Sequence, residues 1–150
     1  MYDNILLCIA LQGWTTPSPH AVAARDAAIA LAKGTTDHLN VLTVFQYNIA
    51  MQGTSSRDDQ MERIDRQMET KMRQFVTDIR EAGVSTTELI WAGNARKLII
   101  DVSQDIEADI IVMGAHSKRN IFDIGLGGTA SHIARLAPCP VLMISPREHQ

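Results

Sequence analysis

The sequence predicts an α/β fold in which a parallel sheet of five strands is covered by about four helices. Two observations carry this prediction: five short apolar runs, and the helical patterns that separate them. Strands that alternate with helices are joined by crossover connections, which favours a parallel, doubly wound sheet. The chain has 150 residues and no linker, internal repeat or low-complexity tract, so residues 1–150 are predicted to form one domain.

The predicted strands are the short apolar runs of the sequence. The first run, Ile-Leu-Leu-Cys-Ile-Ala, carries no charge, as expected for a central strand that is covered on both faces. The expected strands are Ile5–Ala10, Leu39–Phe45, Thr86–Ala92, Ile110–Met113 and Val141–Ile144.

The predicted helices follow loops rich in polar residues, proline or glycine, and the first two helices end at Gly34 and Gly83. The second helix has the clearest period, because methionine, isoleucine and phenylalanine recur on one face. This stripe is predicted to lie in the core rather than to hold a metal or cofactor. Asn94 is placed to cap the third helix. The expected helices are His20–Lys33, Asp58–Ala82, a segment after Asn94 with Leu98, Ile99, Val102 and Ile106 buried, and Thr129–Leu136.

Composition excludes several functional classes. The net charge is −3, which provides no basic field for nucleic acid or acidic lipid. No apolar run approaches the roughly 20 residues that span a bilayer, and the first four residues lack the basic start of a signal peptide. Cys8 and Cys139 are far apart in the sequence and suit inert, reduced thiols. We therefore expect a cytoplasmic chain that does not insert into membranes.

The segment from Asp109 to Thr129 is the most informative for function. A strand-like run leads into a loop of small residues, which carries Lys118 and Arg119, and further glycines precede a helix. Glycine permits close backbone approach to a ligand, and a helix N-terminus attracts anions. The loop is therefore a candidate phosphate cradle. Glycines also serve strand–helix turns for geometry alone, so a purely structural loop remains the alternative.

This segment resembles the nucleotide-binding loop of the universal stress protein family, which reads Gly-2x-Gly-9x-Gly-Ser/Thr after a strand ending in Met-Gly. Here Met113-Gly114 ends the strand, Ser117 stands at the second glycine, Gly127 at the third and Gly128 at the Ser/Thr position. The Ala-Pro-Cys-Pro-Val-Leu sequence at 137–142 is similar to the family's closing segment and fixes this register.

The resemblance covers nearly the whole chain and implies a strand order of 3-2-1-4-5. Ligands would then bind at the switch point between the first and fourth strands. By resemblance, the backbone at Val44 would meet an adenine, and main-chain amides of the loop would face phosphates. His116 lies in this loop without an evident acid partner, and solvent exposure is its expected state. The candidate nucleotide-binding residues are Ala10, Val44, Met113, Gly114, His116, Ser117, Gly127, Gly128 and Thr129.

Three departures from the family pattern predict weak binding. Ala10 stands where nucleotide-binding members end the first strand with an aspartate, and Ser117 adds a Cβ where positive φ is needed, at about 1 kcal/mol. Gly128 lacks a hydroxyl for a phosphate or a Mg²⁺ ion. Each loss costs about 1–2 kcal/mol of binding free energy. The first loop, Leu11–Pro19, is longer than usual, and Trp14 within it has three open roles: stacking on a base, capping the core, or contacting a dimer partner.

The sequence offers no catalytic constellation. It contains no P-loop signature and no Cys/His spacing for zinc. We therefore expect a stress-response module that binds ATP or another adenine nucleotide, with Mg²⁺ only if ATP is bound, and at most a slow ATPase activity. The alternative is a degenerate member that binds no nucleotide and acts through protein–protein association. Val141–Ile144 is by resemblance an apolar edge strand, which predicts a homodimer formed through it.

Overall fold

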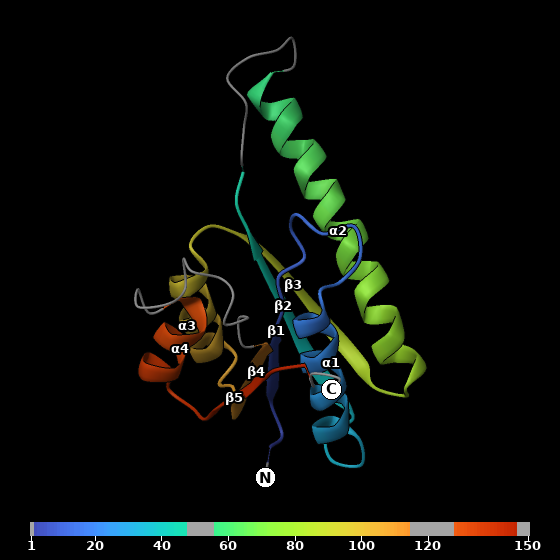
Figure 1. Cartoon of the computed structure of the whole chain (residues 1–150), viewed down its shortest axis with the longest axis vertical. Helices are drawn as coiled ribbons and strands as arrows, with labels where there is room; N and C mark the ends of the chain where they lie inside the picture. Colours follow the sequence, from blue (N-terminus) through green and yellow to red (C-terminus); the bar gives the residue numbers. More distant parts are fainter. Residues whose placement is uncertain (1, 48–55, 115–127, 147–150) are drawn as a thin grey trace.

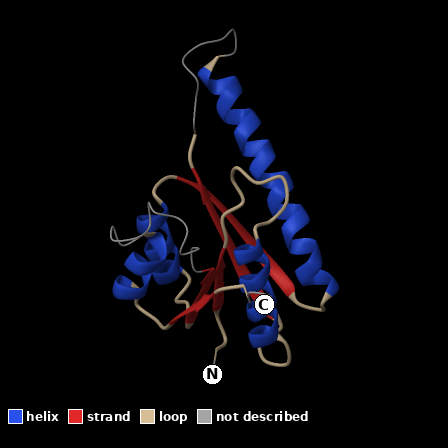
Figure 2. Cartoon of the chain, in the orientation of Figure 1, coloured by secondary structure: helices blue, strands red, loops and turns tan. Residues whose placement is uncertain are grey.

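The computed structural model describes residues 2–47, 56–114 and 128–146, and it contains five strands and four helices in those ranges. The sheet order is β3-β2-β1-β4-β5, and all neighbouring strands are parallel (Figures 1 and 2). Both the doubly wound fold and the strand order are as expected. The elements are β1 (Ile5–Cys8), α1 (Pro19–Ala32), β2 (His38–Phe45), α2 (Arg57–Glu81), β3 (Ser85–Ala92), α3 (Ala95–Asp105), β4 (Ile110–Gly114), α4 (Thr129–Leu136) and β5 (Val141–Ile144).

The sheet lies between two helical layers, with α1 and α2 on one face and α3 and α4 on the other (Figure 1). Side chains of β1 alternate between the two cores: Ile5 and Leu7 face α1 and α2, whereas Leu6 and Cys8 face α3 and α4. All four are buried, which explains why this strand is a continuous apolar run.

Helix α2 packs its apolar stripe against the sheet. Met68, Met72, Phe75 and Ile79 are buried, so the methionine stripe is part of the core, as expected. The beginning of α2 projects past the end of the sheet (Figure 1). Within the described ranges, α2 and the three shorter helices all lack the long apolar stretch that would be needed to cross a membrane.

Several boundaries differ from those expected, for local reasons. Strand β1 ends at Cys8 rather than at Ala10, although the Ile9 amide still donates to the Leu42 carbonyl at 3.0 Å. Helix α1 begins at Pro19 rather than His20. Ser18 caps it by accepting from the Ala21 amide, and proline suits the first helical position, where no amide partner is needed. The other strand and helix ends shift by one residue or coincide with the expected ones.

Candidate ligand-binding cavity

A cavity of about 390 Å³ lies at the carboxyl ends of β1, β2 and β4. This is the switch point of the doubly wound sheet, where the chain leaves β1 for one face and enters β4 from the other. Helices α1, α3 and α4 and the loop after β1 complete the walls. The lining residues are Cys8, Ile9, Ala10, Trp14, Ser18, His20, Ala21, Leu42, Val44, Ala95, Ile99, Met113, Gly114 and Thr129.

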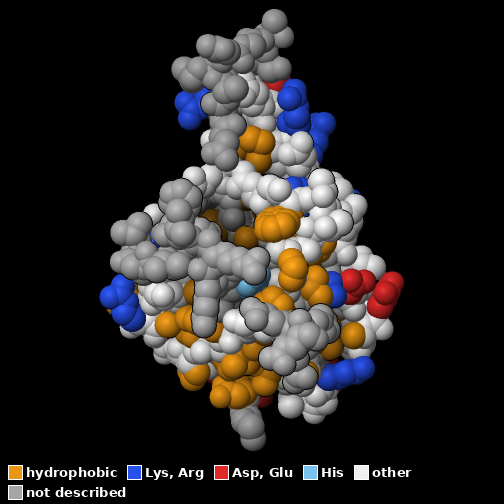
Figure 3. Space-filling model, in the orientation of Figure 1, with side chains coloured by type: hydrophobic (Ala, Val, Ile, Leu, Met, Phe, Trp, Pro, Cys, Tyr) orange, Lys and Arg blue, Asp and Glu red, His pale blue; other side chains and the backbone are white. Residues whose placement is uncertain are grey.

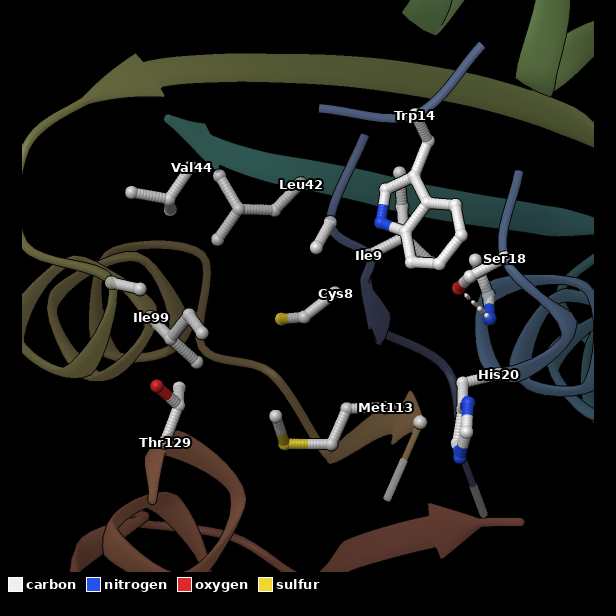
Figure 4. Close-up of a pocket in the computed structure, with 14 residues that line it drawn as sticks. Cys8, Ile9, Trp14, Ser18, His20, Leu42, Val44, Ile99, Met113 and Thr129 are labelled. Carbon is white, nitrogen blue, oxygen red and sulfur yellow. Dashed lines mark hydrogen bonds between the residues drawn. The ribbon is translucent and has the colours of Figure 1, made fainter. Parts of the chain in front are cut away.

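The middle of the cavity is apolar. Figure 4 places the Cys8 sulfur between Leu42 and Val44 of β2 on one side and Met113 of β4 on the other. Ile99 of α3 closes the end away from α1. Aliphatic and sulfur-containing walls of this kind suit a flat apolar ring system.

Polar groups lie at two opposite sides of this apolar centre. Ser18 and His20, from the start of α1, form one side, and Thr129, at the start of α4, forms the other (Figure 4). Among the described lining residues there is no Asp, Glu, Lys or Arg. Two helix N-termini and hydrogen-bond donors without a carboxylate favour an anionic or neutral ligand over a cation.

Gly114 is required by the packing of α1. A Cβ atom at this position would lie 2.9 Å from the His20 Cβ atom and 3.0 Å from the His20 carbonyl oxygen. Only glycine therefore lets α1 approach the end of β4 so closely. This contact accounts for Gly114 without a ligand, and it also holds the His20 side chain at the cavity wall.

Gly128 occupies the N-cap position of α4, with φ −43° and ψ 177° and no side-chain capping bond. Its carbonyl accepts from the His132 amide at 3.0 Å, as in a normal first helical turn. Gly128 is buried, and Thr129, the next residue, reaches the cavity. A hydroxyl is therefore present one residue beyond the position at which the family pattern has it.

Trp14 stands at the edge of the cavity with 49% of its surface exposed. Its loop is fixed to the end of β2, because the Gln12 side chain donates to the Gln46 carbonyl at 2.6 Å and accepts from the Gln46 amide at 2.9 Å. Half-exposed and lining the cavity, Trp14 does not cap the core. Its exposed indole face can stack on a base or contact a partner subunit.

Burial raises the pKa of the Cys8 thiol well above its ordinary value, and the nearby Cys139 raises it further. Desolvation also raises the pKa of Cys139, with a smaller contribution from Asp109. Neither cysteine is in a disulfide. A thiol that resists ionisation is a poor nucleophile, so Cys8 contributes to the cavity as an apolar surface.

Five of the predicted site residues line this one cavity: Ala10, Val44, Met113, Gly114 and Thr129. Gly128 adjoins Thr129. The remaining three, His116, Ser117 and Gly127, lie outside the described residues, as do Lys118 and Arg119.

Sequence reasoning missed Ser18 and His20 as well as the apolar residues Cys8 and Ile99. The Ser-Pro pair ahead of the first helix was an available signal, since it marks a helix start, and helices that follow parallel strands begin at the ligand-binding edge of the sheet. In the described part of the chain, no three His, Cys, Asp or Glu side chains converge on a possible metal site.

Comparisons of the sequence and of the fold with known proteins point to the same family. The sequence model described as "Universal stress protein family" matches residues 1–145. A universal stress protein of Methanocaldococcus jannaschii is 28% identical over 74 residues, which are 49% of this chain and 46% of that protein. The matched segment thus spans about half the length of this curated relative.

Solved structures share the fold. That of the M. jannaschii protein superposes with a TM-score of 0.77 at 19% identity and covers 100% of both chains. A universal stress protein in complex with cAMP gives a TM-score of 0.72 at 16% identity, over 98% of this chain and 100% of the other. A family protein from Arabidopsis thaliana with AMP bound gives 0.59 at 18% identity, over 95% and 92% of the two chains.

Proposed function

This chain belongs to the universal stress protein family, and from that premise we propose that it binds an adenine nucleotide in the cavity between β1, β2 and β4. The observation that carries the proposal is the meeting of five sequence-selected residues, from four separate parts of the chain, in one cavity at the sheet's switch point. Family structures with bound cAMP and AMP support an adenine nucleotide as the ligand class.

The cavity has the size and the chemistry for such a ligand. Its volume of about 390 Å³ lies within the usual range of small-molecule sites, roughly 300–1,000 Å³. Leu42, Val44 and Met113 offer apolar surface to a base. Ser18, His20 and Thr129 are the polar groups available to the ribose and phosphates. Mg²⁺ enters this proposal only as the companion of bound ATP.

We expect the affinity to be weak. Ala10 lines the cavity at the position where nucleotide-binding family members have an aspartate. The described lining contains no Asp or Glu that could supply the missing carboxylate. Loss of one charge-assisted hydrogen bond costs about 1.5–3 kcal/mol, which is roughly one to two orders of magnitude in the dissociation constant. We therefore propose that the protein acts as a cytoplasmic, dimeric regulator without catalytic activity. The fraction of protein that holds nucleotide would follow the cellular concentration of that nucleotide.

Calorimetry on ligand-stripped protein with ATP, ADP, AMP and cAMP tests the proposal. Ala10→Asp should strengthen binding, whereas Val44→Phe should abolish it by filling the base side of the cavity. Ala30→Asp, at an exposed position on α1 that does not line the cavity, is the matched control for added charge. Submicromolar ATP binding by the native chain would refute the expected weakness. Absence of binding at millimolar nucleotide would refute the site.

One observation favours the alternative function, a member without nucleotide that acts through protein association. Gly114 is accounted for by its contact with His20 alone, so the family's signature glycine at this strand end needs no ligand here. Under this alternative the cavity is structural, protein purified from cells releases no nucleotide, and Val44→Phe leaves the biological activity intact.

A further inference from the structure

A second hollow, of about 550 Å³, lies between the loop after β1 and the outer face of α2. The loop contributes Gly13, Trp14 and Thr15, and the helix contributes Arg63, Arg66, Gln67, Thr70 and Lys71. We refer to these eight residues as the α2 groove. It shares Trp14 with the nucleotide cavity but otherwise uses different residues.

The α2 groove is strongly cationic. Its three charged lining residues, Arg63, Arg66 and Lys71, are all basic, although the chain as a whole carries a net charge of −3. Figure 3 shows Lys and Arg side chains gathered on the projecting end of α2, whereas hydrophobic side chains dominate lower on the same face. Three cations on one concave surface repel one another unless an anion lies between them.

These cations are largely available to a ligand. Arg63 forms no ion pair with any described residue. Arg66 pairs with Glu62 at 2.5 Å, but both side chains are more than half exposed, and such pairs contribute little free energy. Lys71 donates to the Leu11 carbonyl at 3.2 Å, which fixes its ammonium group beside the loop while leaving donors free.

The other lining residues narrow the ligand class. Gln67 and Thr70 add neutral donors, and Trp14 adds an exposed aromatic wall. Guanidinium groups match the oxygens of phosphate in a bidentate fashion, and an indole face stacks on planar rings. Glu62 and Glu69 also lie on the exposed surface of α2, next to Arg63 and Thr70 in the sequence, so an extended nucleic acid along this helix would meet negative charges as well as positive ones.

We propose that the α2 groove is a second binding site, which takes a compact ligand bearing two or three linked phosphates. Arg63 and Arg66 hold the phosphate oxygens, Lys71 supplies a fixed positive charge at the loop end, and Trp14 forms the wall next to the nucleotide cavity. This site is independent of the nucleotide cavity and does not require that cavity to bind ligand.

Fluorescence tests the proposal, with inorganic pyrophosphate as the probe. The chain has two tryptophans, so Trp91→Phe leaves Trp14 as the only indole reporter. Pyrophosphate should change Trp14 emission saturably, and the response should weaken as salt rises. Arg63→Ala combined with Arg66→Ala should raise the pyrophosphate dissociation constant roughly tenfold or more, because two charge-assisted contacts are lost.

Arg73→Ala is the matched control, since Arg73 is an exposed arginine of the same helix outside the groove, and it should leave the constant within about twofold. Val44→Phe separates the two sites. It should remove nucleotide binding in the nucleotide cavity and leave the pyrophosphate response of the α2 groove unchanged. If this variant binds ADP more tightly than pyrophosphate, the ligand of the α2 groove is a nucleotide. If it binds the two equally, the ligand is a free chain of phosphates.

Two results would overturn the second site. One is a pyrophosphate response that survives loss of both arginines, and the other is no saturable response at millimolar pyrophosphate. Loss of the pyrophosphate response in Val44→Phe would place the bound pyrophosphate in the nucleotide cavity, and so it would also reject the α2 groove as a site.

Discussion

Gly114 and His20 lie in direct contact, with the Cα of the glycine facing the backbone of the first turn of α1. A Cβ atom added at Gly114 would be 2.9 Å from the His20 Cβ atom and 3.0 Å from its carbonyl oxygen. Real Cβ atoms do not come so close, so the end of β4 and the start of α1 depend on each other. The cavity wall is built on this contact, because both residues line it.

Gly114→Ala is expected to force α1 away from β4 and to destabilise the protein by about 1–3 kcal/mol, as overpacking typically does. Denaturant unfolding measures this cost. The cost should remain when His20→Ala is added, because alanine keeps both atoms that the new Cβ would meet. Full relief in the double variant would assign the contact to the imidazole ring and contradict the backbone argument.

Ser18→Ala is expected to affect both stability and ligand binding. Ser18 caps α1 by accepting from the Ala21 amide at 3.1 Å, and it lines the cavity. Loss of an N-cap costs about 1 kcal/mol and loosens the first turn, which carries His20. Ser56→Ala is the control, because Ser56 caps α2 in the same way but does not line the cavity. It should lower the unfolding free energy and leave nucleotide affinity unchanged; equal losses of affinity would contradict a local effect.

Cys8 is expected to make the protein less stable at alkaline pH. Its thiol pKa is raised in the folded state by burial, so the folded protein holds this proton more tightly than the unfolded chain does. Its contribution to stability is therefore complete below the unfolded-state pKa of about 8.5 and is lost above it, by up to about 1.4 kcal/mol per pH unit.

Comparison of Cys8→Ala with the native chain, by denaturant unfolding from pH 8 to 10.5, isolates this contribution. The variant should show a shallower decline. Cys139→Ala is the control, since Cys139 is only partly buried, and its effect on the slope should be smaller. Parallel declines for native and Cys8→Ala proteins would show that Cys8 ionises normally.

The proposed homodimer is tested at the sheet edge. Among the described strands, β5 pairs with β4 alone, and Leu142 on it is 36% exposed. An unpaired apolar edge invites a partner, so Leu142→Glu is expected to weaken dimerisation by at least tenfold, as seen by analytical ultracentrifugation. Trp91→Glu introduces the same charge on β3, the opposite edge, where the side chain is 50% exposed, and it should leave the dimer intact. A monomeric native protein at micromolar concentration would contradict the proposal.

Much of the fold was predictable from the sequence because its determinants are local. The apolar run of β1, the methionine stripe of α2 and the glycines after α1 and α2 each act within one element and its neighbours. Gly34 and Gly83 adopt φ of +78° and +89°, a conformation that side chains disfavour, so their positions marked helix ends directly. The errors at strand and helix ends were small. They arose where a single hydrogen bond or capping residue sets the boundary of an element, as Ser18 does at the start of α1.

The candidate site was predictable only in part. Val44, Met113 and Gly114 were identified through family resemblance, since periodicity by itself carries no information on strand order. Ser18 and His20 were missed, because their place beside β4 depends on the path of α1 across the sheet.

By itself, the sequence therefore determined which segments form strands and helices, since side-chain period and turn residues act over a few neighbouring positions. Only the tertiary structure decided which residues from distant segments share a wall. It placed His20 against Gly114, placed Trp14 between two hollows, and aligned the arginines of α2 with the loop after β1. The physical reason is that these contacts join residues dozens of positions apart, and they form only when the sheet fixes the helices that carry them.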